Sequence, residues 1–322
     1  MKRSKTACLS GLSYELGRLR PIADIVDDGE SGEAVEILLS KGAQTYSQFD
    51  ESLIDVIKRS AANSLRDSGI RAEEVGAVLV VTESFSGIME ASVGQGRSQF
   101  REARDALFDA LAAVGVTKAP VFCTTFGGSS NFLQAVFMTM PLIETGRIDY
   151  MLIVCADRQP PAVSRFMYDA VALIGDGVAT CVATLKPRPN ADAYELEYVG
   201  ISPFANAADL GDWGRMLLDM YRTAKCAAAD CYDKTQRQPR DFGWLILSNY
   251  NKLSNQVFSR LLGFGDERTY LNNVARTGHV PACDHLINLK DLCLNISLPP
   301  RTPLLLFVNG PISCGTISVI AR

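Results

Sequence analysis

The apolar positions along the chain switch between helical and strand spacing. Residues 51–68 carry apolar side chains at helical intervals and end before Gly69, which predicts a helix. These positions are Leu53, Ile54, Val56, Ile57, Ala61 and Leu65. The unbroken apolar run 77–81 then predicts a strand that is buried on both faces.

The same order of helix, polar turn and apolar strand recurs at 131–154 and, more loosely, at 215–247. Residues 98–115 follow an amphipathic pattern, whose charges predict a solvated helix face. The first strand is expected within residues 1–17. Alternating helices and apolar strands indicate an α/β protein with a sheet covered by helices.

Two halves, 1–188 and 189–322, fit this order. They would meet around residues 186–195, where prolines lie among polar residues. The same stretch is equally compatible with a β-turn inside one domain, so the pattern alone leaves both arrangements open.

Composition narrows the class of protein. A chain of 322 residues can bury a large core, and 47% hydrophobic with 21% charged residues is ordinary globular composition. The net charge of −4 argues against nucleic acid or an anionic membrane as the main partner. No stretch approaches the roughly 18 consecutive apolar residues of a membrane span. The N-terminus also lacks the apolar run of a signal peptide.

Nine cysteines, an odd number without CxxC spacing, predict buried reduced thiols and a cytoplasmic location. Two histidines in the whole chain argue against a His-rich metal site, so no metal is expected.

Candidate chemistry begins in the segment 122–157. The small residues Gly127, Gly128, Ser129 and Ser130 form a turn that opens an almost wholly apolar helix. A hydroxyl in this turn lies at the positive end of the helix dipole, beside backbone N–H groups without an intrahelical partner. Such a place can generate a nucleophile and hold a developing oxyanion.

This segment resembles the ketoacyl synthase III branch of the thiolase superfamily. When the two are aligned without a gap, Ser129 takes the position of the family's nucleophilic cysteine. Residues 174–177 resemble the Gly-Asp-Gly segment of that family, and 244–251 resemble the stretch that holds its catalytic histidine. Residues 276–279 resemble the stretch that holds its catalytic asparagine, and 307–315 resemble its closing glycine-rich turn. The ordered set spans nearly the whole chain.

The resemblance implies a thiolase-like layered αβαβα fold of two similar halves and a homodimer joined through the edges of the central sheet. It also implies coenzyme A or phosphopantetheine thioesters as substrates, with acyl-CoA or acyl carrier protein as partners and no permanently bound cofactor. Residues 204–221 are expected to line or cap the substrate tunnel. Arg158 and Arg165 are candidate coenzyme A ligands at its mouth, although surface arginine is the default interpretation.

The chain departs from the condensing members of the family at three positions. Ser129 stands for Cys, Ser248 for His, and His279 for Asn. A serine hydroxyl needs a general base, and Asp284 follows His279 at a spacing that lets the carboxylate orient the imidazole. These joint changes favour Ser129, His279 and Asp284 as a Ser-His-Asp triad over an active site decayed by chance.

Each site residue also has a structural interpretation. Ser129 could serve close helix packing, with Ser130 as the alternative nucleophile. Asp284 could be the N-cap of residues 285–289. By the resemblance, Gly310 would share an oxyanion hole with the N–H of Ser129, but it could equally be a turn glycine.

Three further positions are expected to be structural. Ser248 is expected only to fill space or form a hydrogen bond. Asn251 is expected to be structural or to support the catalytic residues without touching the substrate. Residues 175–177 are expected to form a turn and not a phosphate-binding loop.

The segment 279–284, opposite a serine, resembles the serine-dependent acyltransferase variants of polyketide and other natural-product pathways. The expected function is acyl transfer through an acyl-serine to a small-molecule or carrier-bound acceptor. An inactive partner subunit of a ketosynthase heterodimer, a thioesterase-like hydrolase and a true condensing enzyme stay open as alternatives.

Overall fold

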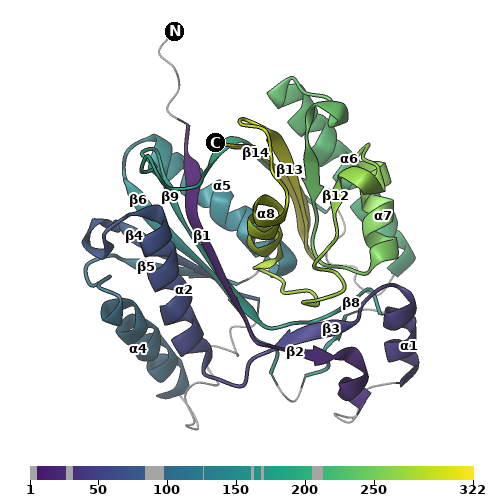
Figure 1. Cartoon of the computed structure of the whole chain (residues 1–322), viewed down its shortest axis with the longest axis horizontal. Coiled ribbons are helices and arrows are strands. Elements are labelled where there is room, and N and C mark those ends of the chain that lie inside the picture. The colour runs from purple at the N-terminus through teal and green to yellow at the C-terminus, as the bar shows by residue number, and fades with distance from the viewer. Residues whose placement is uncertain are drawn as a thin grey trace.

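A computed structural model describes residues 6–26, 32–83, 98–125, 127–160, 163–167, 170–204 and 213–322 (Figure 1). These residues form a ten-stranded sheet in the order β12-β11-β13-β14-β10-β1-β9-β6-β4-β5. Five strands come from the N-terminal part of the chain: β1 (Cys8–Leu16), β4 (Ala77–Val81), β5 (Val121–Thr124), β6 (Tyr150–Asp157) and β9 (Gly177–Thr184). The other five are β10 (Ala193–Pro203), β11 (Trp244–Ile246), β12 (Thr269–Tyr270), β13 (Pro303–Asn309) and β14 (Ser313–Ala321).

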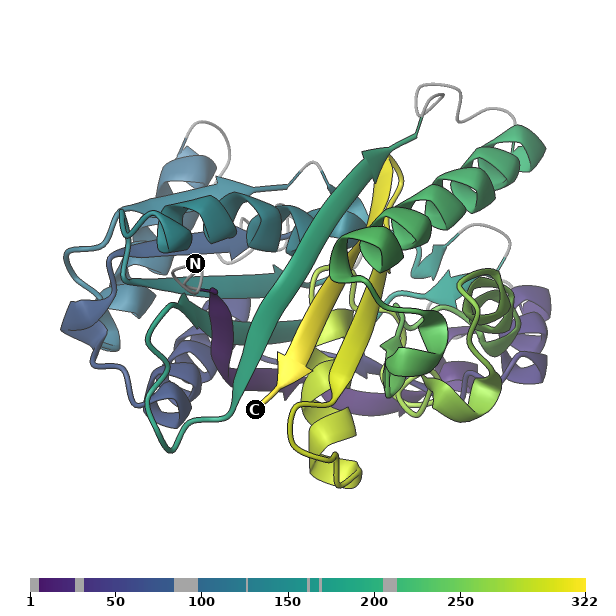
Figure 2. The ribbon, with the colours of Figure 1, turned by 90° about the horizontal axis from the view of Figure 1, so that it is seen from above.

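The two sets of five strands have the same topology. When the strands of a set are numbered one to five in chain order, their order from the outer edge of the sheet to its middle is third, second, fourth, fifth, first in both sets. In each set the second strand is parallel to its two neighbours, and the remaining pairs are antiparallel. Strands β1 and β10 pair with each other and join the sets (Figure 2). The predicted boundary at residues 188 and 189 lies between β9 and β10, and as a domain boundary it stays a prediction.

Strand residues alternate between two cores, which gives the fold its layers. In β4, Leu79 faces a central core, whereas Val78 and Val80 face an outer core. In β13, Leu306 faces the same central core, and Leu305 faces a second outer core. The two halves of the sheet therefore enclose one central layer.

Helices form the central layer and also cover the two outer faces of the sheet. The central layer holds α5 (Asn131–Glu144) and α8 (Asp284–Asn295), as Figure 1 shows. One outer face carries α2 (Leu53–Ser68) and α4 (Ser98–Ala113), and the opposite face carries α6 (Trp213–Thr235) and α7 (Lys252–Leu261). The expected layered αβαβα fold is confirmed.

Short elements gather at one end of the molecule. They are β2 (Arg18–Pro21), η1 (Ile22–Val26), α1 (Gly32–Ser40), β3 (Thr45–Gln48), β7 (Phe166–Met167) and β8 (Ala172–Leu173). They share a small core around the buried Tyr46. The single-turn helices η2 (Ala72–Glu74), η3 (Gly128–Ser130), η4 (Pro239–Asp241) and η5 (Asp266–Arg268) lie in connections.

Most elements expected from the sequence are confirmed. The strand at 77–81 has the predicted bounds, and the helices predicted at 51–68 and 98–115 are α2 and α4. Residues 1–5 lie outside the described residues, and the expected first strand is β1. All nine cysteines are free, and six of them are buried.

Candidate active site

Ser129 lies in the turn 127–130, which we call the nucleophile turn, at the N-terminal end of α5. Its side chain is 1% exposed. The turn is closed by two hydrogen bonds, from Ser130 N to Gly127 O (2.9 Å) and from Gly127 N to Asn131 Oδ1 (2.9 Å). The backbone N–H of Ser129 is without a hydrogen-bond partner among the described residues and lies at the positive end of the α5 dipole.

His279 comes from the other half of the chain and is fixed by its backbone. Its N–H donates to Leu173 O (2.7 Å), and its carbonyl accepts from Gly175 N (2.8 Å). Gly278 precedes it with φ +68°, and a Cβ at Gly278 would lie 2.6 Å from Leu173 O. The loop can therefore approach β8 this closely only with glycine at position 278.

Ser129, His279 and Asp284 form a continuous hydrogen-bonded chain. Ser129 Oγ lies 2.8 Å from His279 Nε2, and His279 Nδ1 lies 2.5 Å from Asp284 Oδ2. A carboxylate accepts only, so the network assigns the proton to Nδ1 and leaves Nε2 to accept from the serine hydroxyl. All three side chains are buried.

Asp284 is held by three further donors. Its Oδ2 accepts from Asn249 N (2.6 Å), and its Oδ1 accepts from Asn249 Nδ2 (3.0 Å) and Val280 N (2.8 Å). The expectation of an N-cap is wrong, because Cys283 occupies that position of α8 and the Asp284 carboxylate bonds back to Val280. The carboxylate therefore stabilises the loop that carries His279.

The charges around His279 favour its protonated form. Burial alone would lower the pKa of the imidazole, but the charge and hydrogen bond of Asp284 oppose burial, aided by the charges of Glu83 and Asp157. The net effect is a pKa above the usual value. An imidazolium formed when His279 takes a proton is stabilised in this setting.

Among the described residues, the other positions predicted for the site form no hydrogen bond with the imidazole of His279. Ser130 Oγ donates to Gly127 O (2.6 Å) and lies 3.0 Å from Ser313 Oγ, so the structure brings Ser129 and not Ser130 to the base. Ser248 is buried, and its carbonyl accepts from Tyr250 N (2.8 Å).

Asn251 is a structural residue at the start of α7. Its Oδ1 accepts from Ser254 N (2.9 Å) as the N-cap, and its Nδ2 donates to Ala170 O (3.0 Å). This agrees with the structural role expected from the sequence.

Gly310 has a different role from the one implied by the resemblance. Its N–H donates to Ser313 O (2.9 Å), which closes the hairpin between β13 and β14, and is thus not free to bind an oxyanion in this structure. A Cβ at this position would lie 2.7 Å from Gly127 O and Ser130 N. Gly310 therefore allows the hairpin to pack directly on the nucleophile turn.

The turn 175–177 is structural, as expected. Asp176 is fully buried and accepts from Phe49 N (2.9 Å) and Gln159 N (2.9 Å). Arg165 donates to both of its carboxylate oxygens, at 2.9 and 3.3 Å. Because Arg165 is committed to this buried ion pair, the default interpretation of a surface arginine is wrong for it, and its candidate role as a coenzyme A ligand finds no support.

Tyr250 belongs to the site, although no role was predicted for it from the sequence. Its ring packs at a tilt against the His279 imidazole, with the ring centroids 4.8 Å apart. Its hydroxyl donates to Asn309 O (2.8 Å). No local pattern in the segment 244–251 indicates this contact, because His279 lies in a distant part of the chain.

The structure is similar to several solved enzymes. One is ChlB3, an acyltransferase, with 17% identity over 98% of both chains and a TM-score of 0.78. Another is 3-oxoacyl-(acyl carrier protein) synthase III of Pseudomonas aeruginosa PAO1, with 18% identity over 98% of both chains and a TM-score of 0.74. A third is Xanthomonas campestris OleA with bound lauric acid and lauroyl-CoA, with 14% identity over 98% of this chain and 99% of that one, and a TM-score of 0.75.

The chain has the thiolase-like fold of ketoacyl synthase III. The sequence itself matches no family model and no curated protein. In this thiolase-like fold, the described residues contain no cluster of His, Cys, Asp and Glu able to hold a metal ion. Nor does any helix of the described part have the length and apolarity needed to cross a membrane.

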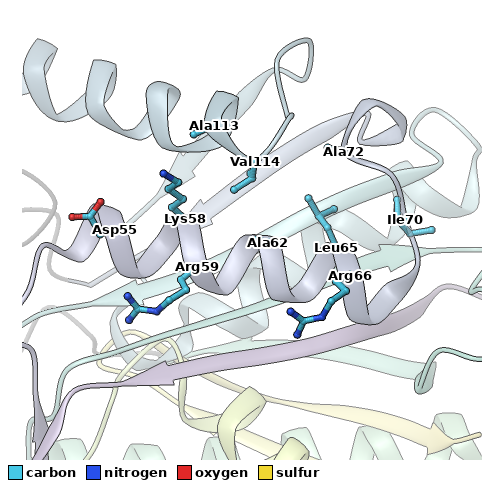
Figure 3. Close-up of a pocket in the computed structure, with 10 residues that line it drawn as sticks. All are labelled: Asp55, Lys58, Arg59, Ala62, Leu65, Arg66, Ile70, Ala72, Ala113 and Val114. Atoms are coloured by element: carbon cyan, nitrogen blue, oxygen red, sulfur yellow. The ribbon is translucent and has the colours of Figure 1, made fainter.

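A cavity of about 630 Å³ lies between α2 and α4, away from Ser129. Figure 3 shows Arg59 and Arg66 pointing from α2 away from α4. Arg59 is paired with Glu51 through two hydrogen bonds of 2.8 and 2.9 Å. This cavity has no contact with the candidate active site.

Two other cavities of the thiolase-like fold flank the candidate active site. One has a volume of about 70 Å³ and is mostly apolar, with Val171, Met220, Phe258 and Tyr250 in its wall. Leu217 and Tyr221 also line it, whereas residues 205–212 of the expected tunnel segment lie outside the described residues. The other, of about 460 Å³, is lined by Glu83 and Asp157 and shares Met167 and Pro311 with the first.

Proposed function

We propose that the protein is an acyltransferase that carries the acyl group on Ser129. The hydrogen bond of 2.8 Å between Ser129 Oγ and His279 Nε2 is the observation that supports this most directly. A serine hydroxyl becomes a nucleophile only when a neighbouring base removes its proton, and His279 lies within reach of that proton.

In the first half-reaction, Ser129 Oγ attacks the carbonyl carbon of an acyl thioester while its proton passes to His279 Nε2. Asp284 stabilises the resulting imidazolium through the bond to Nδ1. The carbon–sulfur bond then breaks, and the leaving thiolate takes the proton from His279. The products are an acyl ester on Ser129 and a free thiol.

The oxyanion of the tetrahedral intermediate needs donors aimed at it. The N–H of Ser129 at the start of α5, which has no partner within the described part of the chain, suits this role. The N–H of Gly310 is held by Ser313 O, so we do not assign it to the oxyanion hole.

In the second half-reaction, His279 takes a proton from the acceptor as the acceptor attacks the acyl ester. The bond between Ser129 Oγ and the acyl carbon then breaks, and the serine regains its proton from His279. Transfer is favoured over hydrolysis because Ser129 is 1% exposed and bulk water does not reach it freely.

The acyl donor is a thioester of coenzyme A or of an acyl carrier protein. The similarity to a 3-oxoacyl-(acyl carrier protein) synthase and to OleA with bound lauroyl-CoA supports this donor class. The apolar cavity of about 70 Å³ beside Tyr250 suits a short acyl chain. We place the reaction in a natural-product pathway, in keeping with the serine-dependent acyltransferases that the motif resembles.

Decarboxylative condensation is not expected. Condensing relatives use a paired His and Asn, and here Ser248 and His279 stand at those positions. Neutral His279 carries its proton on Nδ1, where Asp284 holds it, so its Nε2 has no N–H to donate to a malonyl carbonyl.

We also propose a cytoplasmic homodimer that forms through the sheet edge at β5. Phe122 in this edge strand is 52% exposed, and Cys123 beside it is also exposed. An exposed apolar edge strand is suited to pairing with a second copy of the same strand. The free state of all nine thiols is in keeping with a reducing compartment.

Intact-protein mass spectrometry after mixing with short and branched acyl-CoA and acyl-carrier thioesters tests the proposal. An acyl adduct is expected on the wild type and on Ser130→Ala, the matched control. It should be absent in Ser129→Ala and should form slowly in His279→Ala. Absence of both adduct and thioester turnover with every donor would refute the enzyme and favour an inactive partner subunit. Thioester consumption that releases free acid would identify a hydrolase.

A further inference from the structure

The cavity of about 460 Å³ borders the loop that carries His279 and the hairpin that packs on the nucleophile turn. Pro281, two residues after His279, lines it together with Ile174, whose backbone forms a bridge with His279. Pro311 follows Gly310 in the hairpin that packs on the nucleophile turn. The cavity therefore opens next to the segments that hold both the nucleophile and the base.

Glu83 projects from the end of β4 at the mouth of this cavity. Its Oε1 lies 3.3 Å from the position that a Cβ would take on Gly128, the residue directly before Ser129. Its backbone N–H donates to Asp157 Oδ1 (2.6 Å), which fixes the start of the side chain. Its carboxylate has no hydrogen bond or ion pair with the rest of the described chain.

The neighbouring carboxylate of Asp157 is already occupied by protein donors. It accepts from Thr82 Oγ1 (3.2 Å) and from Ala282 N (2.6 Å) as well as from Glu83 N. Asp157 is 2% exposed, so it contributes charge to the cavity but little free hydrogen-bonding capacity. Glu83 is thus the acidic group that a ligand in this cavity would meet.

Glu83 lines the cavity and is exposed. Desolvation and the charge of Asp157 raise its pKa, while His279 opposes the shift. Its ionised form therefore gains from a cation or a hydrogen-bond donor placed beside it. A second anion in the same cavity would be repelled by both carboxylates.

We propose that this cavity is the acceptor subsite and that Glu83 selects neutral or cationic alcohol acceptors over anionic ones. The inference rests on the proposed acyl-serine function and adds the class of acceptor. The acceptor places an apolar body against Phe166, Met167 and Ile174 and a hydrogen-bond donor on Glu83. Its reacting hydroxyl then faces Ser129 and His279, and malonyl-type acceptors are excluded by their charge.

The test uses three acceptors that share one ring and one hydroxyl. They are trans-4-hydroxycyclohexanecarboxamide, trans-4-aminocyclohexanol and trans-4-hydroxycyclohexanecarboxylate, which are neutral, cationic and anionic at neutral pH. The wild type is first loaded with an acyl group on Ser129, and loss of the adduct with formation of the ester is then followed by mass spectrometry. The anionic alcohol should react at least about tenfold more slowly than the other two, because of two like charges in one cavity.

Glu83→Gln should remove most of this discrimination, whereas Glu73→Gln, an exposed carboxylate on η2, should keep it. Equal reactivity of the three alcohols with the wild type, or unchanged discrimination in Glu83→Gln, would overturn the acceptor assignment and leave the acyl-serine function intact. Calorimetric binding of the same three alcohols to the unacylated protein provides a separate reading. If no adduct forms, the proposed function fails, and a binding preference that Glu83→Gln abolishes would still support the cavity assignment. Equal binding of all three would refute it.

Discussion

Asn249 holds both carboxylate oxygens of Asp284, one through its backbone N–H at 2.6 Å and the other through its side-chain amide at 3.0 Å. The segment that resembles the histidine stretch of the condensing enzymes thus supports the carboxylate that orients His279. Asn249, Asp284 and His279 are therefore linked through one polar network. That network also includes Asn288, whose Nδ2 donates to Asn249 Oδ1 (2.9 Å).

The first prediction concerns this support. Asn249→Ala removes the amide bond to Asp284 but keeps the backbone bond, so acylation of Ser129 should slow by about tenfold, less than in Asp284→Asn. In a serine protease with a Ser-His-Asp triad, the Asp→Asn change lowers kcat by about 10⁴-fold. The unfolding free energy should fall by about 1–3 kcal/mol, because buried partners lose their donor. Single-turnover thiol release and urea unfolding measure the two effects, with exposed Asn190→Ala as the control. Equal rates in Asn249→Ala and the wild type would contradict the role of Asn249.

The second prediction is the pH dependence of acylation. His279 accepts a proton only when neutral, and its pKa lies above the usual 6.5 because Asp284, Glu83 and Asp157 outweigh burial. The acylation rate should therefore fall as the pH drops through a midpoint above 6.5. Asp284→Asn removes the charge that favours the imidazolium, so the midpoint should move to lower pH. A midpoint that stays in place or rises in Asp284→Asn would refute this electrostatic account.

The same shift predicts how stability changes with pH. A histidine whose pKa is raised on folding stabilises the protein fully below its unfolded pKa, and the contribution is lost as the pH rises through the folded pKa. The stability advantage of the wild type over His279→Gln should thus be greatest below pH 6.5 and should shrink as the pH rises through the raised pKa of His279. Urea unfolding at a series of pH values measures it, and a growing advantage would have the wrong sign.

The third prediction separates the ring of Tyr250 from its hydroxyl. Tyr250→Phe loses the bond to Asn309 O but keeps the ring against His279, so we expect a loss of about 1 kcal/mol of stability and nearly normal acylation. Tyr250→Ala should cost about 3–5 kcal/mol through the cavity it leaves and should slow acylation, because the imidazole loses its packing. Denaturant unfolding and single-turnover kinetics provide the comparison. Equal acylation rates in the two variants would show that the ring does not position His279.

The fourth prediction concerns close packing at the nucleophile turn. Gly310→Ala would place a Cβ 2.7 Å from Gly127 O and 2.8 Å from Ser130 Oγ, so the turn must move. Overpacking of this kind costs about 1–3 kcal/mol and should displace Ser129 from His279, slowing acylation. Gly32→Ala meets no atom within 4 Å and is the control. Unchanged acylation in Gly310→Ala would mean that the turn tolerates the shift.

The sequence predicted features that follow from local pattern. The run 77–81 specifies a buried strand because every residue is apolar, and the spacing of His279 and Asp284 lets the two meet within one loop. The contacts of Asn249, Tyr250 and Glu83 could not be predicted, because each crosses between segments whose approach depends on the packing of both halves. The alternative role of Asp284 as an N-cap is not realised, since Asn249 and the nearby backbone N–H of Val280 bind its carboxylate.

Arg165 provides the last prediction, since its two possible roles have opposite consequences. The side chain is 9% exposed and forms a bidentate pair with Asp176, which is fully buried. Arg165→Met should therefore lower stability by about 3–5 kcal/mol, because the buried carboxylate loses its partner. Acylation should slow as well, since the turn 175–177 donates from Gly175 N to the carbonyl of His279.

The double variant Arg165→Met/Asp176→Asn removes the uncompensated charge and should recover part of the stability. Arg158→Met is the control, because Arg158 is partly exposed and its bond to Glu51 O is long, at 3.3 Å, so the stability of this variant should stay close to that of the wild type. Thermal unfolding and the KM for an acyl-CoA donor separate the two roles. A coenzyme A ligand would raise KM without loss of stability, whereas a buried partner of Asp176 must lower stability even without any thioester present.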